Sequence, residues 1–300
     1  MTGTTTPRLT LIGTGTPTPL HHRAGSSYLV EFGEQKLLID CGPGSVRRLL
    51  QRGVDLRSIG HLFLTHLHYD HCVDYGYLVL TRWDQGVGNI PDLEVCGPTP
   101  TAHMTERLFG TDGAFGPDLD ARTQHRGSQF FVEARGGQLP RLLPRPQVTE
   151  VAAGSVVEGD GWRLEAAEVV HVQPQLTCLA YRLTLGDRGI VFGGDTGPTP
   201  ALTELARDAD VLLHMCHYDS NTVSDERITC CCSGHLEAAQ TARDAGVKTL
   251  VLVHLTEQVE AIGVRERLIT EARQVFGGSV IFGEDLAEVP LEGVETEALR

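Results

Sequence analysis

The sequence predicts an α/β protein in which two β-rich layers are covered by helices. Two observations lead to this prediction: each half of the chain opens with short apolar segments that resemble strands, and each half continues into segments that resemble helices. The chain has 300 residues, of which 41% are hydrophobic and 21% charged. This composition is ordinary for a globular protein with a sizeable core, and it excludes disorder as the main state. We expect one domain over residues 1–300.

In the first half, short apolar runs bounded by turn residues indicate the strands. They lie at 9–12, 27–32, 36–39, 61–65 and 93–96, and Gly33-Glu34 joins the second to the third as a hairpin. Helices are expected at 45–52, 72–81 and 100–109. From about 110 to 146 the sequence contains many Gly, Pro and Arg residues and is weakly periodic. We expect an irregular insertion there, either a mobile lid or arm or a solvated loop.

The second half repeats this pattern of strands followed by helices. Strands are expected at 162–170, 177–185, 189–192, 211–214, 249–253 and 280–282, and helices at 200–207, 236–245 and 264–276. No apolar run approaches the 18 residues of a membrane-spanning helix, and Met1 to Arg8 is polar, unlike a signal peptide. Three of the eight cysteines are adjacent, Cys230 to Cys232, which suits a reducing compartment better than a disulfide framework. The expected location is the cytoplasm.

The charge balance restricts the partners of the protein. The chain has 25 Lys and Arg against 39 Asp and Glu, a net charge of −14 with histidine neutral. Such an acidic surface disfavours broad affinity for nucleic acid or for an anionic membrane, although a local basic pocket is compatible with it. The composition also includes 13 histidines, several of them close together in the sequence.

The strongest chemical signal is Thr65-His66-Leu67-His68-Tyr69-Asp70-His71, directly after the strand predicted at 61–65. Alternate residues at a strand end point to one side, so His66 and His68 can converge on one ion. The turn that follows brings Asp70 and His71 to a second position. Imidazole and carboxylate ligands suit zinc, manganese or iron.

Three further ligand-type residues follow other predicted strands. His171 comes after the strand at 162–170, Asp195 lies in the Gly193-Gly194-Asp195 turn, and His254 follows the apolar run at 250–253. Each alone is more often a structural residue, but together with the cluster they indicate a shared metal site. His214, Cys216, His217, Cys230 to Cys232 and His235 are also metal-competent, but their spacing fits no usual structural zinc motif.

These residues resemble the signature of the metallo-β-lactamase superfamily. His66-x-His68-x-Asp70-His71 matches its motif, and His171, Asp195 and His254 match the later ligands in order. The segments at 11–17, 38–44, 180–183, 193–196 and 234–240 resemble the branch that contains ribonuclease Z and the arylsulfatase-like proteins. The resemblance runs from about residue 8 to about residue 257.

The resemblance implies a four-layer αββα sandwich with a dinuclear site at one edge of the sheets. It assigns His66, His68 and His171 to one metal, Asp70, His71 and His254 to the other, and Asp195 to both. Asp40 is expected behind the ligands, where it holds a histidine or a ligand loop in orientation. The expected cofactors are two divalent ions, zinc first, with manganese or iron as alternatives. The branch also implies a homodimer.

Two ligand positions separate this chain from other members of the superfamily. Zinc β-lactamases proper generally lack a bridging carboxylate at the position of Asp195, and flavodiiron oxidoreductases have a carboxylate where His68 stands. Hydrolysis of an ester is therefore expected, with a hydroxide between two cations about 3.5 Å apart as the nucleophile. Asp70 counts both as a ligand and as a catalytic residue. His235 is the candidate that protonates the leaving group, and the alternative is a structural hydrogen bond at a helix start.

The substrate is expected to be a small phosphodiester or a related ester. The alternatives are a sulfate ester, as in an arylsulfatase, or a lactone or carboxyl ester, because the ligands do not select the central atom. Processing of transfer RNA at its 3′ end ranks lower, because Met215 replaces the glutamate that partners the histidine in ribonuclease Z and no Lys-rich arm is visible. A metal-bearing binding module without turnover is a further alternative. His217 is expected at the pocket mouth, in contact with substrate.

Overall fold

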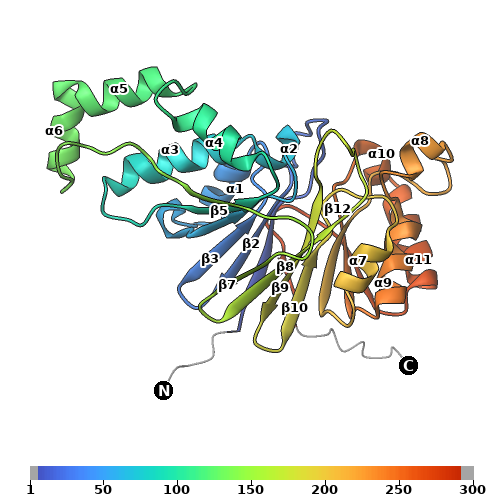
Figure 1. The fold of residues 1–300 in the computed structure, drawn as a ribbon. Coiled ribbons are helices and arrows are strands. Elements are labelled where there is room, and N and C mark those ends of the chain that lie inside the picture. Colours follow the sequence, from blue (N-terminus) through green and yellow to red (C-terminus); the bar gives the residue numbers. More distant parts are fainter. Residues whose placement is uncertain (1–5, 292–300) are drawn as a thin grey trace.

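Two seven-stranded sheets pack face to face in the structure, a computed structural model that describes residues 6–291 (Figure 1). The prediction of two β-layers is confirmed. The first sheet contains, in spatial order, β14 (Glu288–Val289), β1 (Arg8–Gly13), β2 (Ser27–Phe32), β3 (Gln35–Ile39), β4 (His61–Phe63), β5 (Glu94–Gly97) and β6 (Gln147–Glu150). The second contains β13 (Ser279–Phe282), β12 (Thr249–Val253), β11 (Val211–Met215), β10 (Arg188–Phe192), β9 (Leu179–Leu185), β8 (Trp162–Glu168) and β7 (Val156–Gly159).

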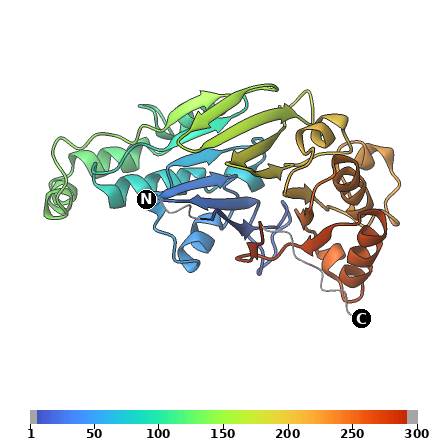
Figure 2. The same ribbon diagram turned by 90° about the horizontal axis from the view of Figure 1, so that it is seen from below.

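Helices cover the outer face of each sheet, which completes the expected αββα order (Figure 2). The first sheet is covered by α1 (Ser45–Gln51), α3 (Tyr75–Gly86) and α4 (Thr101–Phe109). The second is covered by α7 (Pro200–Leu205), α9 (His235–Ala245) and α11 (Val264–Val275). Short helices α2 (Tyr69–Cys72), α8 (Glu226–Thr229) and α10 (Glu257–Glu260) and a 3₁₀ turn at Leu56–Ser58 interrupt the loops. Within residues 6–291, no helix is long and apolar enough to cross a bilayer.

The central core lies between the two sheets and follows from the alternation of side chains along the strands. On β8 the residues Trp162, Leu164 and Ala166 are buried, whereas the residues between them are partly exposed. Trp162 packs edge-on against Phe63 of β4, with the ring centroids 5.6 Å apart, and so joins the two sheets. Burial of each such side chain contributes about 1.5–3 kcal/mol, so the two sheets are held as a stiff support for the loops at their edges.

The carboxyl ends of several strands meet at one edge of this sandwich. Strands β3 and β4 run parallel, as do β10, β11 and β12, and β8 runs with β10 because both are antiparallel to β9. At this edge the Leu179 amide donates to the Thr65 carbonyl at 2.9 Å, and the Tyr181 hydroxyl donates to the Leu64 carbonyl at 2.7 Å. These two bonds connect the end of β4 to the second sheet, so loops from both sheets are fixed relative to one another.

Residues 110–146, called the arm below, differ from the irregular insertion that we expected. The arm contains two helices, α5 (Gly116–Gln124) and α6 (Arg126–Ala134), which lie at the end of the molecule distant from α9 and α11 (Figure 1). Each of these helices buries a single side chain, Leu119 or Val132, so no apolar periodicity announces them. Asp84 at the end of α3 pairs with Arg122, Arg135 and Arg141 of the arm.

Other differences concern element boundaries. The helix expected at 72–81 is α3, which begins at Tyr75 and continues to Gly86. Strands β6, β7 and β14 were not expected, because they are only two to four residues long and mostly exposed. Such short polar strands at the margins of a sheet carry little sequence signal.

Candidate metal centre

The segment from Thr65 to His71 leaves β4 as a tight loop and enters α2. The turn Asp40-Cys41-Gly42, which follows β3, packs directly against it. The Cys41 amide donates to the His71 carbonyl at 2.6 Å, and a Cβ at position 42 would collide with the carbonyl of Asp70. Glycine at 42 is therefore required for the turn to approach so closely, and this contact fixes the loop that carries four predicted ligands.

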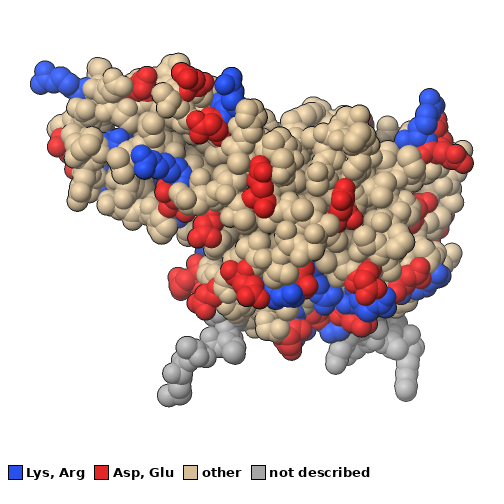
Figure 3. Space-filling view, in the orientation of Figure 1, with Lys and Arg blue, Asp and Glu red and all other residues tan. Residues whose placement is uncertain are grey.

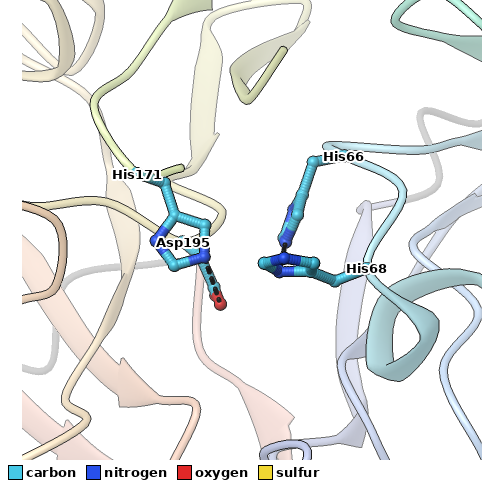
Figure 4. A group of neighbouring side chains, drawn as sticks. All are labelled: His66, His68, His171 and Asp195. Carbon is cyan, nitrogen blue, oxygen red and sulfur yellow. Dashed lines mark hydrogen bonds and ion pairs between the residues drawn. The ribbon is translucent and has the colours of Figure 1, made fainter. Parts of the chain in front are cut away.

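His66, His68 and His171, called the three-histidine group below, converge with Asp195 (Figure 4). Their ligand atoms all lie within 4.8 Å of one another. His66 Nε2 and His68 Nδ1 are 3.0 Å apart, and His171 Nε2 lies 3.7 Å from Asp195 Oδ2. The two histidines of the β4 loop face His171 and Asp195 across a gap, as expected for side chains around a common ion.

Asp70, His71 and His254, called the Asp70 group below, converge with the same Asp195, again within 4.8 Å. His254 Nε2 lies 3.1 Å from Asp195 Oδ2 and 3.3 Å from Asp70 Oδ2, and His71 Nε2 lies 3.3 Å from Asp195 Oδ1. All four side chains are buried. The structure thus brings the seven predicted ligands together in the two sets that the sequence indicated, with Asp195 common to both.

The donor atoms of the Asp70 group fit a divalent cation. Among the buried side-chain atoms of the described residues, Asp70 Oδ1, His71 Nε2 and Asp195 Oδ1 have no hydrogen-bond partner. A buried polar atom without a partner is costly, and a bound cation would satisfy all three. Imidazole nitrogen and carboxylate oxygen are ligands for zinc, manganese and iron, so the chemistry of the set agrees with its geometry.

Asp40 contacts His71 from behind, which is the position expected for it. His71 Nδ1 donates to Asp40 Oδ2 at 2.7 Å, so Nε2 is left facing Asp70 and Asp195. Asp40 in turn accepts from the Thr65 amide at 2.8 Å and from the Thr65 hydroxyl. Its φ is +58°, a conformation that non-glycine residues adopt at a cost and that the surrounding contacts must maintain. The carboxylate therefore fixes both the tautomer and the orientation of the ring.

The other rings are oriented in the same way. In three further histidines, Nδ1 has a protein partner and Nε2 faces the centre: His66 with the Thr65 hydroxyl at 3.1 Å, His171 with the Cys231 carbonyl at 2.8 Å, and His254 with His217 Nδ1 at 3.3 Å. A ring that is held at one nitrogen presents the other with little entropic cost on binding an ion, so the centre is organised in advance.

The comparisons with known proteins agree with this geometry. The family model described as the metallo-beta-lactamase superfamily matches residues 20–230. The chain belongs to the metallo-β-lactamase superfamily. It lies in the ribonuclease Z-like branch: a protein named ribonuclease Z from Mycobacterium marinum (strain ATCC BAA-535 / M) is 34% identical over 287 residues, which are 94% of this chain and 97% of that protein.

Two solved structures show the same metallo-β-lactamase fold. The metallo-beta-lactamase fold protein YhfI from Bacillus subtilis has a TM-score of 0.72 and 21% identity, and the match covers 94% of this chain and 98% of that chain. The short form of human tRNase Z has a TM-score of 0.66 and 20% identity, covering 95% of this chain and 99% of that chain. The His and Asp clusters are typical of the dinuclear site of this superfamily, to which metal-dependent hydrolases belong.

The electrostatics differ between the two groups of this metallo-β-lactamase site. Burial raises the pKa of Asp195, but the neighbouring His254 and His71 outweigh it and hold that pKa well below its usual range. Burial lowers the pKa of His254, but Asp195 and Asp70 raise it to about 9. In contrast, burial and the adjacent His71 hold the pKa of His66 well below its usual range. Without a metal, the Asp70 group therefore carries protons where the three-histidine group offers free lone pairs.

His235 does not have the environment expected of a general acid. It begins α9 and is fully buried, and its Nε2 lies 2.7 Å from Glu271 Oε2 of α11. Its Nδ1 accepts from the Ser220 amide at 3.3 Å. It joins Asp219 and Glu271 in a separate cluster, outside both sets of ligand atoms. Since both ring nitrogens are occupied and the side chain has no exposure, the structure argues against the acid role and favours the alternative of a structural hydrogen bond.

His217 is half-buried beside the site. Its ring lies 5.3 Å from that of His254, centroid to centroid, and burial together with His254 lowers its pKa to about 4. A neutral His217 accepts a hydrogen bond from His254 Nδ1, so it positions a predicted ligand. Contact with substrate remains a prediction. The supporting contacts of Thr65 and of the Cys231 carbonyl were missed, since neither residue type nor spacing marks such a contact.

Proposed function

We propose that the protein is a dinuclear metal-dependent hydrolase of a small phosphodiester or a related ester. The observation that supports this most directly is the sharing of Asp195 between the two ligand groups, because a shared carboxylate holds two ions close enough to act on one substrate. Two divalent cations bound there, zinc in the first instance, would supply an activated water and Lewis acidity toward the ester.

The residues of the chain have distinct tasks in this proposal. His66, His68 and His171 hold one ion, Asp70, His71 and His254 hold the other, and Asp195 fixes their separation. Asp40 and His217 keep the rings of His71 and His254 in register. Because these contacts exist before any ion binds, little reorganisation is needed when charge develops on the substrate, which is the condition for electrostatic stabilisation of the transition state.

Phosphorus is the proposed central atom because the relatives at 34% identity are named ribonuclease Z, and ribonucleases act on phosphodiester bonds. A small substrate is proposed rather than RNA because the basic residues of the arm are largely neutralised. Arg122, Arg135 and Arg141 pair with Asp84. Acidic side chains are scattered over the face drawn in Figure 3, whereas basic ones gather on the arm and the lower edge. RNA binding usually needs several unpaired cations.

A panel of chromogenic esters tests the proposal. Protein loaded with two equivalents of Zn²⁺ or Mn²⁺ is assayed with bis(p-nitrophenyl) phosphate, p-nitrophenyl sulfate and p-nitrophenyl acetate, before and after removal of the metal by a chelator. We expect chelator-sensitive turnover that is fastest on the phosphodiester. Asp112→Asn, a substitution of an exposed aspartate, serves as the control and should retain that activity. Preference for the sulfate or the carboxyl ester would replace phosphorus as the central atom. Two bound metals without turnover on any ester would favour a binding module.

Processing of transfer RNA is the second candidate, and the names of the relatives favour it. The test is cleavage of a 3′-extended transfer-RNA transcript by the same metal-loaded protein. We expect weak cleavage, because Met215 stands where the family has glutamate. A kcat/KM for the transcript that exceeds that for the small diester by orders of magnitude would reverse the ranking.

We also propose a homodimer in the cytoplasm. All eight cysteines are free, which suits a reducing compartment. The arm exposes Phe130, Phe131 and Leu142, with about two thirds of each side chain accessible, a feature common in surfaces that bind another protein. The arm is also richer in basic residues than the otherwise acidic chain, so a second copy offers it complementary charge. Sedimentation of the wild type beside Phe130→Ser/Phe131→Ser measures this, and a monomeric wild type would refute it.

A further inference from the structure

The loop that follows α8 places two thiols beside a ligand of the metal centre. The sulfur atoms of Cys231 and Cys232 and a ring nitrogen of His171 all lie within 4.8 Å of one another. His171 Nδ1 donates to the Cys231 carbonyl at 2.8 Å, so the ring that faces Asp195 on one side contacts this loop on the other. This cluster lies outside the Asp70 group and has no part in the function proposed above.

The loop is held firmly in this position. The Ser233 hydroxyl donates to the Thr196 carbonyl at 2.8 Å, and the Tyr218 hydroxyl donates to the Cys232 carbonyl at 3.1 Å. A Cβ at Gly197 would collide with the carbonyl of Cys230, so the loop lies directly on the chain that follows Asp195. These contacts fix the two sulfur atoms relative to His171, as a binding site requires.

The accessibility of the thiols separates them from the other cysteines. Cys41, Cys72, Cys96, Cys178 and Cys216 are buried, whereas Cys231 and Cys232 are partly exposed. Cys230 is exposed too, but its sulfur is not part of the cluster. An ion from solvent can therefore reach the pair, and Cys230 provides a neighbour that has the same chemistry without the same geometry.

We propose that Cys231, Cys232 and His171 form a binding site for a thiophilic metal ion, distinct from the two ions of the His and Asp groups. Thiolate sulfur is a soft ligand that selects ions such as Cu⁺, Zn²⁺ and Cd²⁺, and imidazole is compatible with them. Binding releases the thiol protons, because the thiolate is the ligand. Since His171 also faces the three-histidine group, an ion at the thiols contacts the catalytic centre through that ring.

Absorption spectroscopy with Cd²⁺ tests this site. Protein loaded with two equivalents of Zn²⁺ and kept reduced is titrated with Cd²⁺, and the ultraviolet thiolate-to-cadmium charge-transfer band is followed. Histidine and carboxylate ligands give no such band, so exchange of Cd²⁺ into the His and Asp groups does not produce the signal. We expect the band to saturate at one equivalent for the wild type and for Cys230→Ser, and to be absent in Cys231→Ser/Cys232→Ser. His171→Ala should weaken the Cd²⁺ affinity roughly tenfold or more.

Several outcomes would overturn the proposal. These are a wild type without the band, a band of equal intensity in Cys231→Ser/Cys232→Ser, and loss of the band in Cys230→Ser. An unchanged Cd²⁺ affinity in His171→Ala would exclude the histidine as a ligand. Circular dichroism and Zn²⁺ content of the double variant should match those of the wild type, which separates loss of this site from loss of the fold. The band does not depend on turnover, so failure of the hydrolase proposal would leave the result interpretable.

Discussion

The two ligand groups share Asp195 but differ in burial and in charge. The Asp70 group is buried throughout, and it adds the carboxylates of Asp70 and, behind His71, Asp40 to that of Asp195. The three-histidine group has one buried ring, His66, and two that are partly exposed, and it supplies no carboxylate of its own. Carboxylates that are confined together raise the pKa of adjacent histidines, whereas histidines confined together lower one another's.

This difference indicates how the two positions would exchange ions. In the Asp70 group, an ion replaces protons that already balance the buried carboxylates, and it has little access to solvent. In the three-histidine group, the lone pairs are free and two rings are reached from outside. We expect the three-histidine position to load and exchange faster, and the Asp70 position to depend more on the residues around it.

The largest effect is expected from Asp195→Asn, which removes what the two groups share. Asparagine keeps the shape but loses the negative charge, so both ions lose a ligand. We expect less than one metal per chain and a fall of roughly three orders of magnitude in kcat/KM on the best ester. Metal content by mass spectrometry and steady-state kinetics measure this, with Asp112→Asn as the control. Two retained metals would show that the groups do not depend on a common carboxylate.

Next in size is a matched pair of substitutions, one in each group. Asp70→Asn should lose the ion of its own group, and His68→Gln should lose the other, so each variant keeps about one equivalent. Substitution with Co²⁺ reports which remains, because a site of three histidines and one carboxylate gives a different visible spectrum from a site of two histidines and two carboxylates. If the spectra of the two variants are identical, the groups are not independent binding positions.

The metal centre was predictable from sequence because its ligands follow strands. The spacing from His66 to His71 is local, and His171, Asp195 and His254 each come after an apolar run that proved to be, or to end near, a strand of the second sheet. His235 could not be placed in this way. Which partner a buried ring meets depends on how α9 packs against α11, and Glu271, the partner in question, lies 36 residues further along the chain.

The arm was misjudged for a related reason. Its helices depend on contacts with another element, the pairing of three arginines with Asp84 and the stacking of Arg141 on Trp83 at 3.5 Å from the ring centroid. A helix that buries one side chain has no clear periodicity, and its stability comes from such tertiary contacts. The composition of the arm therefore favoured an irregular segment.

A smaller effect is expected from Asp40→Asn, which acts on one group only. The amide keeps a hydrogen bond to His71 but removes the charge that holds its orientation and basicity. We expect the Zn²⁺ affinity of the Asp70 group to fall about 10- to 100-fold while that of the three-histidine group stays unchanged. Competition with a chromogenic chelator resolves the two steps. Asp84→Asn, which alters only the contacts of the arm, is the control, and equal weakening of both steps would contradict the separation of the groups.

The smallest effect concerns His214, a buried histidine in neither group. It has no carboxylate hydrogen-bonded to its ring: Nδ1 lies 3.0 Å from the Met215 carbonyl, and Nε2 has no partner among the described residues. Burial lowers its pKa to about 4 from an ordinary value of 6.5. The unfolded chain therefore binds this proton first, and the folded state loses stability as the pH falls from 6.5 toward 4.

His214→Gln removes this titration and keeps a donor for the carbonyl. Between pH 7 and pH 5.5, the wild type should lose about 1 kcal/mol more unfolding free energy than the variant. Urea denaturation of both proteins with metals removed measures the difference, since His71 and His254 then contribute equally to each. Parallel pH profiles would mean that His214 is protonated in the folded state, as His71 is, and that a neighbouring carboxylate is not needed to keep a buried histidine charged in this sandwich.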